Sequence, residues 1–372
     1  MTAPDPGAPA RPLRPVNPRA FGPAAGEGRF TFAVAGDGRP TVAGMPFPTV
    51  TAQIMRELAL LRPAFALYTG DAIFGYRHSR QQMLNELDRF RALAHTSRVP
   101  VFNIPGNHEA QSSETAMEVL AQWGHDLYGS FDFHGYHFVG LNTDEPNREG
   151  RVTGEQLAWL ERDLSAAAPD ARGTFVFMHR PLFSWFQGDF NPDDAQVLMR
   201  LFAAHGVRAV FAAHDHFYYE EEHDGVRYVT VGGAGGPFYT QPPSGGFSHY
   251  VLVSCEGESA ELNVVEPGRL DVAFLAGNDG VEPVTTARIA NITDRDLVAR
   301  GLRMQVPRLG DPSGYRVSAV SRDFALREVA LDAPVAEVED LGDGSVALTV
   351  EVLLPTGCGV WVTAEARDPG DA

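Results

Sequence analysis

The chain has 372 residues and lacks lysine altogether, so its 30 basic residues are all arginine. They are outnumbered by 48 acidic residues, which gives a formal net charge of −18. A protein that binds duplex nucleic acid needs a basic face that displaces counterions, so this composition argues against that class. It remains compatible with a small anionic substrate, because bound metal ions can reverse the field inside a single pocket.

Cysteine and long apolar runs are scarce as well. Cys255 and Cys358 are too few for a disulfide-rich scaffold or a cysteine-based zinc finger, although a single disulfide remains open. No run of about 18 apolar residues occurs, so we expect no membrane span. The proline-rich residues 1–28 have no apolar stretch of the kind a secretory signal needs. We therefore expect a disordered segment over 1–28 and a cytoplasmic protein.

The rest of the chain divides into two textures. Residues 29–266 alternate between short apolar runs and helix-like segments, which is typical of an α/β domain. Its expected strands are 30–35, 65–68, 100–104, 174–178 and 209–212, and its expected helices are 49–61, 81–94, 153–164 and 192–202. Thr153 and Gln156 form a candidate capping box for the third of these helices.

Residues 267–372 lack helical periodicity. Short apolar runs between turn signals predict a C-terminal β-sandwich with strands at 285–292, 302–306, 315–320, 335–338, 345–354 and 359–364. This part of the chain also contains no histidine, because all twelve histidines lie between His78 and His249. Chemistry that uses imidazole must therefore belong to the first domain.

Five expected strands of that domain each lead into a residue that can bind a metal. These residues are Asp37, Asp71, Asn107, His179, and the pair His214 and His216. Taken singly, an aspartate after a strand is usually a turn residue and a buried histidine usually a satisfied core residue. As an ordered set they predict one crevice, because ligands gather at the carboxyl ends of the strands in open α/β sheets. Mixed oxygen and nitrogen ligands suit manganese, iron or zinc. Six of them are natural for two ions about 3.5–4 Å apart that share a carboxylate.

The motifs around these residues resemble those of the calcineurin-like metallophosphoesterases, within them the bacterial branch similar to purple acid phosphatases. The resemblance spans roughly residues 30–265. It is carried by Gly36-Asp37, Thr69-Gly70-Asp71, Pro105-Gly106-Asn107-His108-Glu109, Phe177-Met178-His179-Arg180-Pro181 and His214-Asp215-His216. It implies a four-layer αββα fold, in which two mixed sheets lie between helices with a dinuclear site at one edge.

The same resemblance implies a role for each site residue. Asp71 would bridge both ions, with Asp37 and His216 completing the first site. Asn107, His179 and His214 would complete the second. His108 would not be a ligand; it would face the phosphate and either stabilise charge or protonate the leaving oxygen.

These roles predict a metal-dependent hydrolase of small phosphoric esters. Two divalent or trivalent ions (manganese, iron or zinc) offset phosphate charge and lower the pKa of a bridging water toward neutrality, so that a metal-bound hydroxide can attack phosphorus. Monoesters would favour an added cation such as Arg39, whereas diesters would favour His108 as a proton donor. The alternative is a degenerate, non-catalytic phosphate-binding or scaffold protein.

Two positions depart from the family pattern. Arg39 stands where the family has a histidine on the first metal, and Phe74 stands where purple acid phosphatases have a tyrosine, with Tyr76 two residues further on. The first metal then has only Asp37, Asp71 and His216, unless Tyr76 reaches it. Arg39 either binds a phosphate oxygen or pairs with a nearby acid.

The roles of three further segments stay open on sequence alone. Arg180 is a structural or a functional neighbour of His179. Residues 142–144 follow another apolar run and are candidates for the pocket lining. The loop 183–191, with its aromatic residues, is either a substrate platform or packed core.

Overall fold

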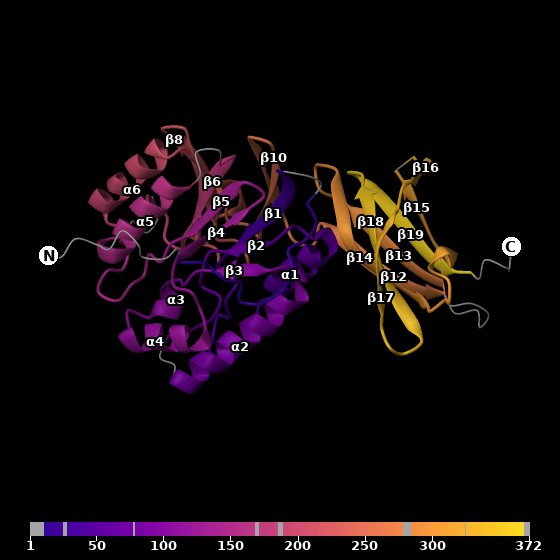
Figure 1. Cartoon of the computed structure of the whole chain (residues 1–372), viewed down its shortest axis with the longest axis horizontal. Coiled ribbons are helices and arrows are strands. Elements are labelled where there is room, and N and C mark those ends of the chain that lie inside the picture. Colours follow the sequence, from indigo (N-terminus) through magenta and orange to yellow (C-terminus); the bar gives the residue numbers. More distant parts are fainter. Residues whose placement is uncertain are drawn as a thin grey trace. The chain divides into compact units, whose positions relative to one another are not determined.

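The computed structural model describes residues 11–24, 28–76, 79–167, 171–184, 189–277, 284–323 and 325–367. The chain divides into two compact units, one of residues 1–55 and 64–264 and the other of residues 56–63 and 265–372 (Figure 1). The sequence prediction placed 56–63 with the first domain. These residues group with the second unit because they contact it: the Gly268 N–H, for example, donates to Glu57 Oε1 at 2.6 Å.

Two mixed sheets form the first unit. One has the order β11-β10-β1-β2-β3, in which β1 (Arg29–Ala35), β2 (Ala66–Tyr68) and β3 (Val101–Asn103) run parallel. Next to β1 are the antiparallel β10 (Tyr250–Glu256) and then β11 (Ser259–Val265).

The second sheet has the order β4-β5-β6-β7-β9-β8. Its central strands β5 (Tyr136–Gly140), β6 (Gly173–Phe177), β7 (Val207–Ala212) and β9 (Val226–Val231) are parallel. Antiparallel strands β4 (Gly129–Phe133) and β8 (Tyr218–His223) form its two edges.

Aromatic residues fill the space between the two sheets. This core takes Phe32 and Phe65 from the first sheet, or just before its strands, and Phe138, Phe175 and Phe211 from the second. The rings of Phe32 and Phe138 meet edge to face at 5.3 Å between centroids, which is a favoured aromatic geometry. Apolar residues are also buried on the opposite face, such as Val176 and Val210, so these central strands are covered on both faces and read as nearly continuous apolar runs.

Helices cover the outer faces and complete four layers. The helices are α1 (Thr49–Leu61), α2 (Arg80–Thr96), α3 (Asn107–Ala110), α4 (Glu114–Trp123), α5 (Gly154–Ala166) and α6 (Pro192–Ala204). Phe90 of α2 packs on Tyr68 of the first sheet, with ring centroids 5.0 Å apart. Leu160 of α5 and Leu198 of α6 share a second apolar cluster with Val210 of β7. The predicted αββα sandwich is thereby confirmed, and Figure 1 shows α5 and α6 beside the second sheet.

The expected capping box at the start of α5 is wrong. Thr153 is the N-cap residue, but its side chain makes no capping hydrogen bond. Gln156 is buried and its amide instead pairs with the backbone of Asn142, accepting from N–H at 2.8 Å and donating to C=O at 2.9 Å. Satisfying two buried backbone groups outweighs a cap that water could replace.

The N-terminal segment packs on the first unit over residues 11–24, which corrects the expectation of disorder for this part; residues 1–10 and 25–27 lie outside the described residues. The Leu13 N–H donates to Ser130 O at 2.9 Å. The buried Asn17 side chain accepts from Val101 N–H at 2.7 Å and donates to the Ala94 and Val99 carbonyls. Leu13 and Val16 are buried as well, so a few apolar side chains order the segment together with these hydrogen bonds.

The second unit contains the predicted β-sandwich. One sheet has the order β12-β13-β19-β15-β16 and the other β14-β18-β17. The strands are β12 (Leu270–Gly277), β13 (Val284–Asn291), β14 (Leu297–Pro307), β15 (Tyr315–Arg322), β16 (Glu328–Leu331), β17 (Val335–Asp340), β18 (Ser345–Leu354) and β19 (Cys358–Ala366). Sequence analysis missed β12 and β16, and it started β14 at residue 302 because a register shift between Ala299 and Leu302 interrupts the alternation.

Two features concern the cysteines and the membrane. Cys255 and Cys358 are both free thiols, so the disulfide left open by the sequence is not formed. Among the described residues, no helix combines the length and apolar character needed to cross a membrane.

Candidate active site

Tight turns after the strands bring the predicted ligands to one edge of both sheets. Asp37 follows β1, Asp71 follows β2, and His214 follows β7, and all three have left-handed backbones with φ of 61°, 54° and 66°. This conformation costs about 1–3 kcal/mol for residues other than glycine and persists only where the surroundings enforce it. Such turns direct side chains from three strands toward a common point instead of along their strands.

Three ligand atoms form a compact triangle on one side of the site. Asn107 Oδ1 lies 2.9 Å from His179 Nε2 and 2.9 Å from His214 Nδ1, and the two ring nitrogens are 3.2 Å apart. Ligands at about 2.0–2.2 Å from one ion are separated by distances of this order. An amide and two neutral imidazoles carry no charge, so this half of the site adds no negative charge.

The other side of the site is built around two buried carboxylates. Asp37, Asp71 and His179 each offer a ligand atom, and these atoms lie within 4.8 Å of one another. Asp37 Oδ1 is fully buried and has no hydrogen-bond partner among the described residues, while His216 Nε2 lies 3.5 Å from it. A buried carboxylate oxygen left without a donor is costly unless a cation completes it. The residues present therefore fit a bound metal ion.

His216 is held in place by one hydrogen bond and one stacked ring. Its Nδ1 contacts the Pro237 carbonyl at 2.7 Å, which directs Nε2 toward Asp37. The ring of Tyr239 stacks on the imidazole at 4.4 Å and 11°. Sequence analysis had no signal for either contact, because both come from the loop after β9.

Asp71 lies between the two halves and contacts His179, His108 and Arg39. Its Oδ1 is 3.4 Å from His179 Nε2 and accepts from the His108 N–H at 3.0 Å, while its Oδ2 is 3.4 Å from Arg39 Nε. Burial raises the pKa of Asp71, but His179, His108 and Arg39 outweigh it and hold that pKa well below its usual range. The carboxylate is thus ionised and central, as a bridging ligand must be.

Glycine permits the close approach of these loops. Gly70 has φ of +89°, and a Cβ there would lie 2.7 Å from Gly106 N and 2.9 Å from His179 Nδ1. A Cβ on Gly106 would lie 2.3 Å from Asp71 Oδ1. A side chain at either position would push apart the residues that converge on Asp71.

His108 is placed beside the carboxylates without joining the triangle. Its Nδ1 donates to the Phe74 carbonyl, and its Nε2 lies 3.7 Å from Asp71 Oδ2. Burial lowers the pKa of this imidazole, with Asp71 opposing the change. The ring therefore lies beside Asp71 on the side that faces Arg39.

Arg39 and Tyr76 lie on different sides of the site. The Arg39 guanidinium pairs with a nearby acid, Asp71, and its side chain is only 13% exposed. The Tyr76 hydroxyl accepts from Asn107 Nδ2 at 2.7 Å, and its ring meets that of His108 at 4.4 Å. Tyr76 therefore contacts the Asn107 side of the site, whereas the idea of a tyrosine ligand required it on the Asp37 side.

Glu109 organises the backbone beneath the site, and sequence analysis gave it no role. The buried carboxylate accepts from the N–H groups of Asp71, Ala72, Ile73 and Gly106 at 2.6–3.0 Å. Burial raises the pKa of Glu109 to about 7, while the N–H donors act in the opposite direction. One side chain thus ties the turn after β2 to the turn after β3.

Arg180 and residues 142–144 form a support on the His214 side. Arg180 Nε donates to the fully buried Asp144 at 2.7 Å, and the Arg180 N–H donates to Thr143 Oγ1 at 3.1 Å. Arg180 Nη1 also reaches Asp189 Oδ2 at 3.1 Å. Sequence analysis missed Asp189, because an isolated aspartate inside a loop carries no pattern.

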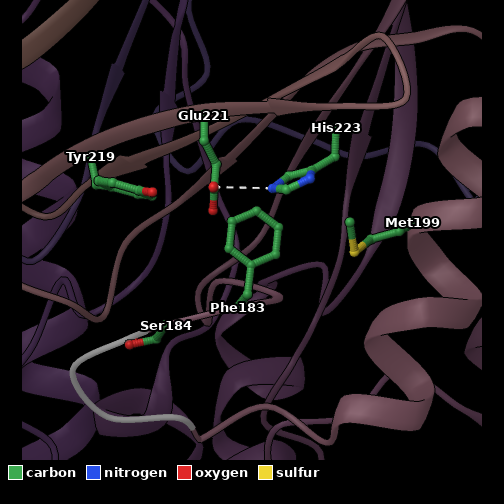
Figure 2. Close-up of a pocket in the computed structure, with 6 residues that line it drawn as sticks. All are labelled: Phe183, Ser184, Met199, Tyr219, Glu221 and His223. Atoms are coloured by element: carbon green, nitrogen blue, oxygen red, sulfur yellow. Dashed lines mark ion pairs between the residues drawn. The ribbon is translucent and has the colours of Figure 1, made fainter.

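The loop that follows Arg180 lines a separate open pocket of about 650 Å³. Figure 2 shows Phe183 among its lining residues, with Glu221 and His223 of β8 paired at 3.1 Å behind it. Phe183 also meets Tyr228 edge to face at 5.1 Å. Phe183 is thus half-buried pocket wall, and Trp185 and Phe186 lie outside the described residues.

The chain is similar to phosphoesterases in three comparisons with known proteins. A family model described as calcineurin-like phosphoesterase matches residues 47–218, a range that includes all the predicted site residues except Asp37 and Arg39. The serine/threonine-protein phosphatase CPPED1 of Danio rerio is 28% identical over 192 residues, which span 47% of this chain and 60% of that protein. A purple acid phosphatase from yellow lupin (Lupinus luteus) seeds, PPD1, has a TM-score of 0.52 at 16% identity.

The extent of these matches limits what they carry over. The lupin match covers 73% of this chain and 53% of that structure, and at 16% identity it shows a common fold alone. The chain thus matches less than two thirds of the length of either protein.

Proposed function

We propose that this chain, which belongs to the calcineurin-like phosphoesterase family, hydrolyses small phosphoric esters with two metal ions bound at the edge that its two sheets share. The observation that carries the proposal is the convergence of six metal-binding side chains from five strand ends, with Asp71 at their centre. Bound ions would supply a nucleophile at neutral pH and offset the charge of the phosphoryl group. Manganese, iron and zinc all suit the mixed oxygen and nitrogen donors.

The ligands divide into two sets in this proposal. Asn107, His179 and His214 hold one ion through the atoms of their triangle, and Asp37 and His216 hold the other. Asp71 contributes to both, because its two oxygens face different neighbours.

Two residues act on the ester itself. Arg39 orients one phosphoryl oxygen through its guanidinium, which lies beside Asp71. His108 Nε2 holds or transfers a proton to the leaving oxygen. The Phe74 carbonyl fixes the ring for this purpose by binding Nδ1.

The test is a metal-dependent phosphoesterase assay on the full chain. The protein is stripped with a chelator and reloaded with Mn²⁺, Zn²⁺ or iron, and bound metal is counted by elemental analysis. Hydrolysis of p-nitrophenyl phosphate and of bis(p-nitrophenyl) phosphate then separates monoesterase from diesterase activity. We expect about two ions per chain and turnover that returns with metal. Metal binding without hydrolysis of either ester would favour the non-catalytic alternative.

A further inference from the structure

His214 presents its two ring nitrogens to two different environments. Nδ1 faces Asn107 Oδ1 and His179 Nε2, at 2.9 Å and 3.2 Å, and so belongs to the ligand triangle. Nε2 points the other way and lies 2.9 Å from Asp189 Oδ2. Asp189 lies in the loop after β6, and none of the sequence motifs includes it.

We infer that Asp189 is a positioning residue that keeps the His214 imidazole in its metal-binding tautomer. The inference rests on the proposed function for its biological meaning. A carboxylate accepts hydrogen bonds and cannot donate them, so its contact with Nε2 places the proton on Nε2. In the neutral imidazole this leaves the lone pair on Nδ1, which is the form that a metal ligand must have.

Arg180 favours the opposite tautomer. Its Nη1 lies 3.1 Å from the same His214 Nε2, and a guanidinium can only donate. That contact is favourable when Nε2 carries the lone pair and the proton sits on Nδ1. The Nδ1 proton would then be donated to Asn107 Oδ1, and two atoms of the triangle would be lost to a hydrogen bond.

Asp189 decides this competition in two ways. It accepts from His214 Nε2, and it also accepts from Arg180 Nη1 at 3.1 Å, which gives that donor another partner. Arg180 is anchored from behind by the buried Asp144, at 2.7 Å, so it stays in place when Asp189 is removed. The Asp189 side chain is 39% exposed, so its loss leaves no buried cavity.

The first measurement is the affinity for metal alone. Asp189→Ala is titrated with Mn²⁺ and Zn²⁺ by calorimetry, and we expect binding at the tighter site to weaken about 10- to 100-fold, the usual effect of losing a partner of a ligating histidine. Asp189→Asn keeps a carbonyl oxygen that can accept from Nε2, so its affinity should be intermediate. Equal thermal stability of the variants excludes a general loss of structure.

The second measurement is the tautomer itself. Long-range ¹H–¹⁵N correlation spectra of the metal-free protein should show His214 with its proton on Nε2 in the wild type and on Nδ1 in Asp189→Ala. The matched control is Asp132→Ala, which removes a carboxylate 2.7 Å from His137 Nδ1 and outside the site. This control should leave both metal affinity and the His214 spectrum unchanged.

The outcomes separate this inference from the proposed function. An unchanged His214 tautomer in Asp189→Ala overturns the positioning role, even if metal binding weakens. A wild-type chain that binds metal but cleaves no ester overturns the proposed function and leaves the Asp189 result standing. If the wild type binds neither ion, the proposed function fails, while the spectrum of the metal-free protein still decides the role of Asp189.

Discussion

The two halves of the candidate site differ in how completely the chain defines them. On one half, Asn107, His179 and His214 place three neutral donor atoms within 2.9–3.2 Å of one another. On the other half, Asp37 Oδ1, which has no hydrogen-bond partner among the described residues, faces His216 at 3.5 Å, and Arg39 pairs with Asp71. The donor atoms of the first half are already close together, whereas the second half contains a buried carboxylate oxygen that no hydrogen bond satisfies among the described residues.

This difference has a consequence for metal binding. Ligand atoms already gathered need little reorganisation to bind, and a guanidinium near a carboxylate competes with a metal for it. We therefore expect the Asn107 half to bind metal more tightly than the Asp37 half. The predictions below test that ranking, beginning with the residue that both halves share.

Asp71→Ala should have the largest effect, because Asp71 lies between both halves. We expect loss of bound metal from both positions and a fall in turnover of at least about a thousandfold, since the ions supply several kcal/mol of charge stabilisation. Elemental analysis and the p-nitrophenyl phosphate assay measure the two effects. Asp132→Ala is the control, and full metal content in Asp71→Ala would contradict a bridging role.

His108→Ala tests whether a residue that contacts the shared carboxylate belongs to either half. A proton donor contributes about 10²- to 10⁴-fold to the rate, so turnover should fall by that order with two ions still bound. Esters with a basic alkoxide leaving group should suffer more than p-nitrophenyl phosphate, whose leaving group needs less protonation. Loss of metal along with activity would make His108 a ligand instead.

Arg39 distinguishes the two halves most directly. Arg39→Ala removes a charge-assisted hydrogen bond worth about 1.5–3 kcal/mol, so KM for a monoester should rise about tenfold or more. Arg39→His replaces the cation by a potential ligand and should tighten binding of the weaker ion. If both ions bind with the same affinity, and neither substitution changes it, the expected difference between the halves is wrong.

The smallest expected effect concerns a buried histidine outside both halves. His125 accepts from Asn103 Nδ2 through Nε2 at 2.8 Å, and burial lowers its pKa to about 4. The folded chain keeps it neutral while the unfolded chain protonates it below about pH 6.5. Stability should therefore decline as pH falls from about 6.5 to 4, because unfolding takes up the proton.

Urea denaturation at pH 7.0, 5.5 and 4.5 measures this dependence. His125→Leu should reduce the slope of stability against pH, whatever its effect on stability at pH 7.0. His205→Gln, which changes a half-buried histidine at the end of α6, should leave the slope as it is. An unaltered slope in His125→Leu would show that other groups carry the acid sensitivity.

Local sequence predicted the elements well wherever pattern and tertiary environment agree. The helix expected over 49–61 coincides with α1, and the six candidate site residues were singled out because each lies just after an apolar run. The sequence-based predictions failed where a residue distant in sequence determines the local structure. Gln156 left its capping position for the backbone of Asn142, and residues 11–24 were ordered by Val101 and Ser130.

The order of residues along the chain was enough to predict the fold class, the β-sandwich and a set of candidate metal-binding side chains, because periodicity and strand-end chemistry are local properties. Tertiary structure alone decided which atoms of those side chains meet. It directed Arg39 to Asp71, Tyr76 to Asn107 and Asp189 to His214. Each of these pairings joins loops that follow two neighbouring strands of one sheet (β1 and β2, β2 and β3, β6 and β7), so it depends on which strands lie side by side, and local sequence does not carry that information.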